Sequence, residues 1–156
     1  MTHAADVVDL LAGLAPDHPL RLIRDLRPDA RANAQRSFEA LLEPAEPGAF
    51  TYAERYAVAA FVARLHGSDR AAAFYADLLG DADAALVPVI DGAARQGATA
   101  GPTGTYREPG LAAESVATDP WTPDAATCDA VGPRLAAVLT HAQADRPAAD
   151  PRSDIS

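Results

Sequence analysis

The stretch FTYAERYAVAAFVARLHGSDRAAAFYADLL, residues 50–79, contains the clearest helix signals of the sequence. Thr51 and Glu54 stand three positions apart in front of an apolar run, which is the capping-box pattern of a helix start. Gly67 interrupts the run, and Ser68 is then a residue type that favours the N-cap of a second helix. The stretch therefore predicts two helices that a tight turn joins as an antiparallel pair.

Apolar residues recur with helical spacing on both sides of this pair. The pattern predicts an entry helix capped by Thr2, a short second helix from Pro19, a third helix capped by Asp29, and an end at Gly80 for the second helix of the pair. Further helical segments follow at residues 81–97, with a kink or start at Pro88, and after residue 122, with a break at 132–133.

No segment alternates with period two over a useful length, so the sequence predicts an all-α fold. We expect a single helical domain over residues 1–144. Within it, residues 97–123 are rich in Gly, Thr and Pro and predict a long loop. Residues 145–156 lack any apolar period and predict a disordered tail.

The composition of the 156-residue chain excludes several classes of function. All 13 basic residues are arginine, which excludes lysine Schiff-base chemistry and the lysine of a P-loop. The 22 acidic residues leave a net charge of −9, so nucleic acid is not an expected partner. The longest apolar run, residues 56–63, is far shorter than the roughly 20 residues that span a membrane. With no signal-peptide pattern at the N-terminus, we expect a cytoplasmic protein without membrane contact.

The single cysteine, Cys128, excludes an intramolecular disulfide and a multi-cysteine metal site. No dinucleotide, metalloprotease or serine-hydrolase motif is present in the sequence. We therefore predict no cofactor and no metal.

The central pair resembles the core of the carboxymuconolactone decarboxylase and alkyl hydroperoxidase D superfamily. In the peroxidase branch of that superfamily the second helix opens with CxxCxxxH, and a glutamate on the preceding helix relays protons. A thiolate at a helix N-terminus is stabilised by the helix dipole, so one cysteine attacks peroxide and the other resolves it. The segments ARANAQRSFEALLEP, AERYAVAAFVARLHG, AAFYADLL and GPTGTYREPG resemble a subgroup of CMD-domain proteins that lack CxxC and are encoded beside a peroxidase-like paralogue. The resemblance covers roughly residues 3–144.

Three positions determine what this resemblance implies for activity. The motif places Ser68 and Ala71 at the two cysteine positions and Tyr75 at the histidine position. Because serine and alanine cannot form a redox couple, the resemblance implies an alkyl hydroperoxidase D-like bundle without the thiol chemistry. The three residues share one helical face and form the predicted pocket. The chain passes into a polar tail where the subgroup continues with further helices, so we expect a bundle that is incomplete at its C-terminus.

Other candidate residues have both a functional and a structural interpretation. The resemblance makes Glu54 a proton-relay carboxylate, whereas the local pattern makes it a capping-box residue. His66 is suited to acid–base catalysis or to interaction with a helix C-terminus. Cys128 is either a redox thiol or a small packing residue. The stripe formed by Arg31, Gln35 and Glu39 suits an anion site or, more simply, a solvated ladder.

Three functions follow. The first is a non-peroxidatic partner or scaffold subunit, in a homo-oligomer or in a hetero-oligomer with a peroxidase-like paralogue. The second is a cofactor-free acid–base lyase of the decarboxylase type, in which Glu54 and His66 move protons and Tyr75 shapes a pocket for a small apolar ligand. The third is residual alkylhydroperoxidase activity through Cys128, an oxidoreductase function that needs an external reductant. The first is preferred, so the protein is expected to lack enzyme activity.

Overall fold

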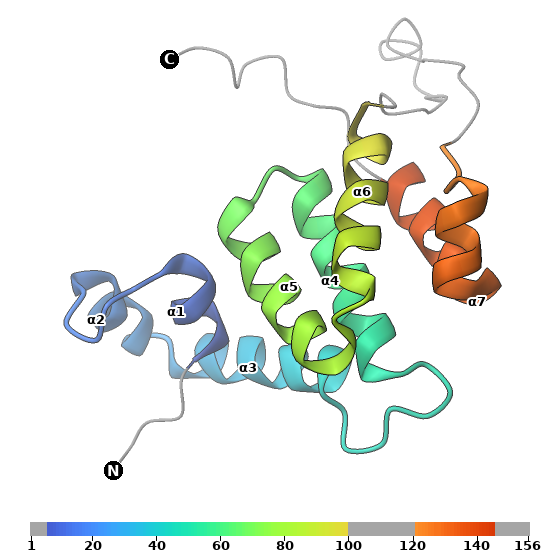
Figure 1. The fold of residues 1–156 in the computed structure, drawn as a ribbon. Helices are drawn as coiled ribbons and strands as arrows, with labels where there is room; N and C mark the ends of the chain where they lie inside the picture. Colours follow the sequence, from blue (N-terminus) through green and yellow to red (C-terminus); the bar gives the residue numbers. More distant parts are fainter. Residues whose placement is uncertain (1–5, 100–120, 146–156) are drawn as a thin grey trace, which may run out of the picture. The chain divides into compact units, whose positions relative to one another are not determined.

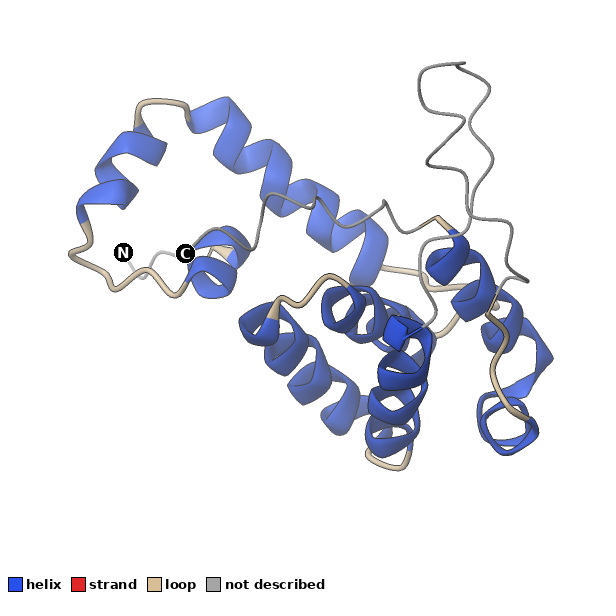
Figure 2. Ribbon diagram, turned by 90° about the horizontal axis from the view of Figure 1, so that it is seen from above, coloured by secondary structure: helices blue, strands red, loops and turns tan. Residues whose placement is uncertain are grey.

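The computed structural model describes residues 6–99 and 121–145, and these residues form helices, turns and loops without a strand (Figure 2). The described helices are α1 (Val7–Ala12), α2 (Pro19–Asp25), α3 (Pro28–Leu42), α4 (Tyr52–Leu65), α5 (Asp69–Asp83), α6 (Leu86–Thr99) and α7 (Ala125–Ala144). The predicted all-α class is therefore confirmed. Among the described helices, none has the length and apolarity needed to cross a membrane.

Two predicted helix starts are wrong. The cap of α1 is Asp6, whose side chain accepts hydrogen bonds from the backbone of the first turn, and Thr2 lies outside the described residues. In α3 the N-cap is Arg27 and the helix begins at Pro28, not after Asp29. Proline suits this first position because it has no N–H to leave unpaired and its φ is already helical.

Two glycines were wrongly predicted to end helices. Gly80 lies inside α5, where a Cβ atom would stand at an ordinary contact distance of 3.8 Å from the side chain of Val87, and the helix continues through this position. Gly97 lies inside α6, which extends to Thr99. The predicted loop therefore starts later than expected, and residues 100–120 of that loop lie outside the described residues, as does the predicted tail after residue 145.

The chain divides into two compact units, residues 1–56 and 57–156. The boundary falls within α4, so a single long helix contributes to both. The expected single domain over residues 1–144 stays a prediction, and each compact unit is described by itself. The contacts that hold the helices together differ between the two units.

In the first unit, α1 and α2 pack against α3 (Figure 1). Its buried residues are Asp6, Val7 and Asp9, so two of the three carry charge. Several large apolar side chains of this unit are instead exposed: Leu10, Leu20, Leu22, Ile23, Leu26 and Leu41. Polar contacts, rather than an apolar core, therefore hold the described part of this unit.

In the second unit, α6 packs between α5 and α7 and the core is apolar. Its fully buried large side chains include Phe61, Leu79, Leu135 and Leu139. Phe61 also stacks on Trp121, with ring centroids 5.5 Å apart. The predicted break in the last helix is confirmed, because Gly132 has a φ of 79° and precedes a proline.

Candidate functional site

The turn between α4 and α5 has the hydrogen bonds of a Schellman motif. Gly67 adopts a φ of 67°, which favours glycine, and its N–H donates to the carbonyl of Arg64 at 3.0 Å. The N–H of Ser68 donates to the carbonyl of Ala63, also at 3.0 Å. The helix pair is therefore formed as predicted, with Ser68 as the N-cap residue of α5.

The structure does not bring Glu54 and His66 together. Glu54 accepts a hydrogen bond from the N–H of Thr51 at 2.8 Å, and its own N–H donates to the Thr51 hydroxyl at 3.2 Å. This is the reciprocal bonding of a capping box. His66 is exposed just after the other end of α4. Twelve positions on one helix correspond to about 18 Å, so the two side chains cannot act on one substrate atom.

The predicted pocket residues on α5 differ in their exposure. Ser68 is exposed and its side chain makes no capping hydrogen bond. Ala71 is half-buried. Tyr75 is half-buried against the edge of Phe74, with ring centroids 5.3 Å apart, and burial raises the pKa of its hydroxyl. Tyr75, which the resemblance aligns with a histidine, is therefore a phenol that stays protonated at neutral pH.

Cys128 is half-buried in the second turn of α7. Its thiol donates to the carbonyl of Pro123, with Sγ and oxygen 3.5 Å apart. The N-terminus of α7 is capped by Asp124, which accepts from the N–H of Thr127 at 2.8 Å. A half-buried thiol that contacts a backbone carbonyl suits a packing residue better than a nucleophile.

Arg55, which follows Glu54 in the sequence, binds the last turn of α3 and the loop before α4. Its guanidinium donates to three carbonyl oxygens: Phe50 at 3.1 Å, Leu41 at 2.7 Å and Pro47 at 3.1 Å. It also stands over the Phe50 ring. A planar group with five donors suits such a contact, and the sequence did not predict it. Both residues of the Glu54–Arg55 pair therefore have structural partners.

A groove of about 240 Å³ lies between α4, α5 and α6 in the second unit. It is lined by Ala60, Arg64, Ala72, Ala76, Leu79, Val87, Pro88, Ile90 and Asp91. Arg64 pairs with Asp91 at 3.1 Å and with Asp69 at 3.4 Å, and Arg95 also pairs with Asp91. Because these charges balance, the groove suits a small neutral apolar molecule better than an ion.

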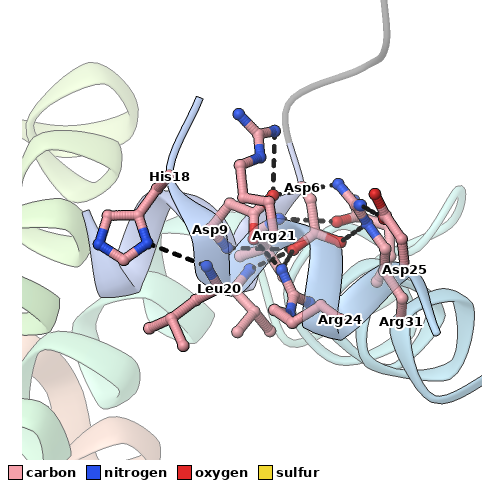
Figure 3. A network of polar contacts seen from close by, with 11 residues as sticks. Asp6, Asp9, His18, Leu20, Arg21, Arg24, Asp25 and Arg31 are labelled. Atoms are coloured by element: carbon pink, nitrogen blue, oxygen red, sulfur yellow. Dashed lines mark hydrogen bonds and ion pairs between the residues drawn. The ribbon is translucent and has the colours of Figure 1, made fainter. Parts of the chain in front are cut away.

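The first unit contains a cluster of two carboxylates and three arginines, which we call the arginine–carboxylate cluster: Asp6, Asp9, Arg21, Arg24 and Arg31 (Figure 3). The carboxylates belong to the N-terminus of α1, and the arginines belong to α2 and α3. Asp6 binds Arg24 at 2.8 Å and Arg31 at 3.0 Å. Asp9 binds Arg21 and Arg31 at 3.0 Å each, and Arg24 as well.

The surroundings of Asp6 favour its charged form. Burial by itself would raise the pKa of this carboxyl, but hydrogen bonds from Arg24, from the Asp9 N–H and from Arg31 outweigh burial and lower the pKa below its ordinary value. The same contacts raise the pKa of Arg24. At neutral pH the cluster therefore consists of ion pairs.

The stripe of Arg31, Gln35 and Glu39 forms neither a plain solvated ladder nor a site for a free anion. Arg31 binds the carboxylates of α1 and also Asp25. Gln35 accepts from the N–H of Val7 at 3.0 Å and donates to Glu39 at 2.9 Å. The anions that this stripe binds are therefore side chains of the same chain, and the stripe fixes α1 on α3.

Two features were not predicted from the sequence. Asp6 with Asp9, and Arg21 with Arg24, each stand three apart, a spacing that would have indicated two charged helix faces. Ala72, Ala76 and Leu79 share a helical face, which would have indicated the groove wall, but nothing in the sequence pairs Arg64 with Asp91. Among residues 6–99 and 121–145, no group of His, Cys, Asp and Glu suits a metal ion.

The sequence matches no known family model, and no curated protein or solved structure is detectably similar to it. The resemblance to the alkyl hydroperoxidase D superfamily therefore stays a prediction from the motif residues.

Proposed function

We propose that this chain is a non-peroxidatic protein of the alkyl hydroperoxidase D type that acts as a scaffold or partner subunit, in an oligomer of its own copies or with a peroxidase-like paralogue. One observation carries the proposal. The α4–α5 pair has the tight turn that the catalytic helix needs, but an exposed serine and an alanine occupy the N-cap and third positions of α5, where the two cysteines are expected.

The acid–base alternative has less support. Glu54 closes a capping box, and His66 lies at the opposite end of the same helix. The groove between α4, α5 and α6 contains one carboxylate, Asp91, and this carboxylate is paired with Arg64 and Arg95. Each of the two carboxylate oxygens of Asp91 contacts a guanidinium group, which leaves this carboxylate poorly placed to accept a proton from a substrate.

A peroxide-consumption assay with a dithiol reductant tests the proposal. We expect no turnover from the wild-type protein or from the Cys128→Ser variant, since the sequence offers no second thiol. Turnover that the Cys128→Ser substitution abolishes would contradict the proposal and assign the activity to that thiol.

The double variant Ser68→Cys/Ala71→Cys is the matched control, because it tests whether the CxxC motif aligns with positions 68 and 71. Two cysteines three apart at a helix start are close enough to form a disulfide. We expect mild oxidation to protect both new thiols from alkylation, as mass spectrometry would detect. Two thiols that stay reduced would mean that the motif does not align at these positions.

A further inference from the structure

Helix α2 has its charged face turned inward and its apolar face turned outward. Arg21 and Arg24 point to the α1 carboxylates, and their side chains are only 21% and 20% exposed (Figure 3). The apolar side chains are much more exposed, with values of 49% for Leu20, 71% for Leu22, 60% for Ile23 and 80% for Leu26. An exposed apolar face of this kind is typical of an interaction surface.

This orientation follows from the geometry of the helix. Successive residues turn by about 100°, so Arg21 and Arg24 share one side of α2. Leu22, Ile23 and Leu26 occupy the opposite side, and Leu20 lies at the edge beside Arg24. The arginine–carboxylate cluster fixes the first side against α1, and the apolar side therefore cannot turn inward without breaking the ion pairs with Asp6 and Asp9.

We infer that the apolar face of α2 binds the same face of a second copy of this chain, with the two helices antiparallel about a two-fold axis. This inference rests on the proposed role as a subunit of an oligomer and assigns a surface to it. In this arrangement Ile23 lies near the axis, and Leu22 of one copy meets Leu26 of the other. A two-fold interface uses one patch twice, so the patch must complement itself.

The charges at the two ends of α2 meet this requirement. Asp17 precedes the helix and Arg27 follows it, and both side chains are exposed. Neither makes an ion pair within the described part of the chain. Antiparallel packing places Asp17 of each copy beside Arg27 of the other, whereas parallel packing would bring like charges together.

The exposed area suits a weak dimer. With about 100 Å² of apolar area for each side chain, Leu22, Ile23 and Leu26 of two copies correspond to an interface on the order of 1,000 Å² once its polar part is included. This value is at the lower end for specific interfaces. We therefore expect a dissociation constant in the micromolar range.

A membrane surface fits α2 less well than a second copy does. Helices that lie on membranes usually present several free basic residues toward anionic lipid. Here Arg21 and Arg24 are bound to carboxylates, and the exposed Asp17 and Asp29 would be repelled by the same lipid.

Sedimentation equilibrium of the full chain tests the pairing through a charge exchange. We expect the wild-type protein to dimerise with rising concentration, and Asp17→Arg or Arg27→Asp alone to weaken dimerisation by at least about tenfold, because each places like charges together. The double variant Asp17→Arg/Arg27→Asp restores the opposite-charge contacts and should return to within about threefold of the wild type. Since both positions are exposed, circular dichroism should show unchanged helix content.

Three results would overturn the inference. A double variant that stays as weak as the single variants would exclude the antiparallel contact. A wild-type monomer with α2 amides protected from hydrogen exchange would mean that the same chain covers this face. A monomer that binds neutral lipid vesicles would assign the face to lipid. None of these results depends on peroxide turnover, so the proposed lack of peroxidase activity is tested separately.

Discussion

Asp6 combines two roles that one substitution can separate. Its side chain caps α1 and also binds Arg24 and Arg31. Asparagine caps a helix about as well as aspartate, so the Asp6→Asn variant keeps the cap and removes the charge. We expect the variant to lower the stability of the first unit by about 1–3 kcal/mol at pH 7, since hydrogen bonds to charged groups contribute on that order.

The pH dependence of this loss has a definite sign. The folded pKa of Asp6 lies below its ordinary value, so its contribution is fully present above an unfolded pKa of about 3.9 and disappears as the pH falls through the lower folded pKa. Urea unfolding followed by hydrogen exchange should show a constant difference between wild type and Asp6→Asn from about pH 7 to pH 5, and a smaller one below about pH 4. Asp77→Asn, at an exposed position of α5, is the control. A difference that grows on acidification would contradict the assignment.

At the residue scale, the sequence predicted a side-chain contact correctly where the two residues that form it are close together in the sequence. Thr51 and Glu54 form the predicted capping box because both partners lie in one helical turn. The partners of Asp6 are 18 and 25 positions away, and no local pattern pairs them. The stripe of Arg31, Gln35 and Glu39 was predicted, but the carboxylates that Arg31 binds were not.

At the scale of the elements, the turn between α4 and α5 depends on one backbone conformation. Gly67 has a φ of 67°, and a Cβ atom there would meet nothing within 4 Å. The cost of Gly67→Ala is therefore conformational, and we expect the free energy of unfolding to fall by about 1–2 kcal/mol. Thermal unfolding of the variant measures this loss.

The matched control is Gly92→Ala in the interior of α6. A Cβ atom at Gly92 also meets nothing within 4 Å, but no left-handed φ is involved. The same chemical change should therefore raise stability by about 0.5–1 kcal/mol, because alanine favours the helix. Equal effects of the two substitutions, in either direction, would contradict the conformational explanation.

The sequence predicted most helices but misplaced several of their ends. Turn glycines and helix-interior glycines are the same residue type, and only the left-handed φ of Gly67 distinguishes it from Gly80, which lies inside α5. The outward face of α2 could not be predicted either. Apolar periodicity identifies the two faces of a helix, but the face that turns inward depends on carboxylates from another element.

At the scale of the whole molecule, the two units differ in what holds them. The described part of the first unit buries Val7 and two carboxylates, whereas the second unit buries large apolar side chains such as Phe61 and Leu139. The sequence predicted one domain because 156 residues is the length of one ordinary domain. Length does not reveal that α2 and α3 leave much of their apolar surface exposed.

This difference predicts that the two units open separately. Leu139 is fully buried, so Leu139→Ala should lower the stability of the second unit by about 2–5 kcal/mol through cavity formation. In native-state hydrogen exchange we expect this variant to speed exchange in α5, α6 and α7, and Asp6→Asn to speed exchange in α1, α2 and α3. If each variant instead speeds exchange equally in all six helices, the chain unfolds as one cooperative domain. The ion pairs of the first unit would then be coupled to the apolar core of the second, and the single domain predicted from the sequence would be correct.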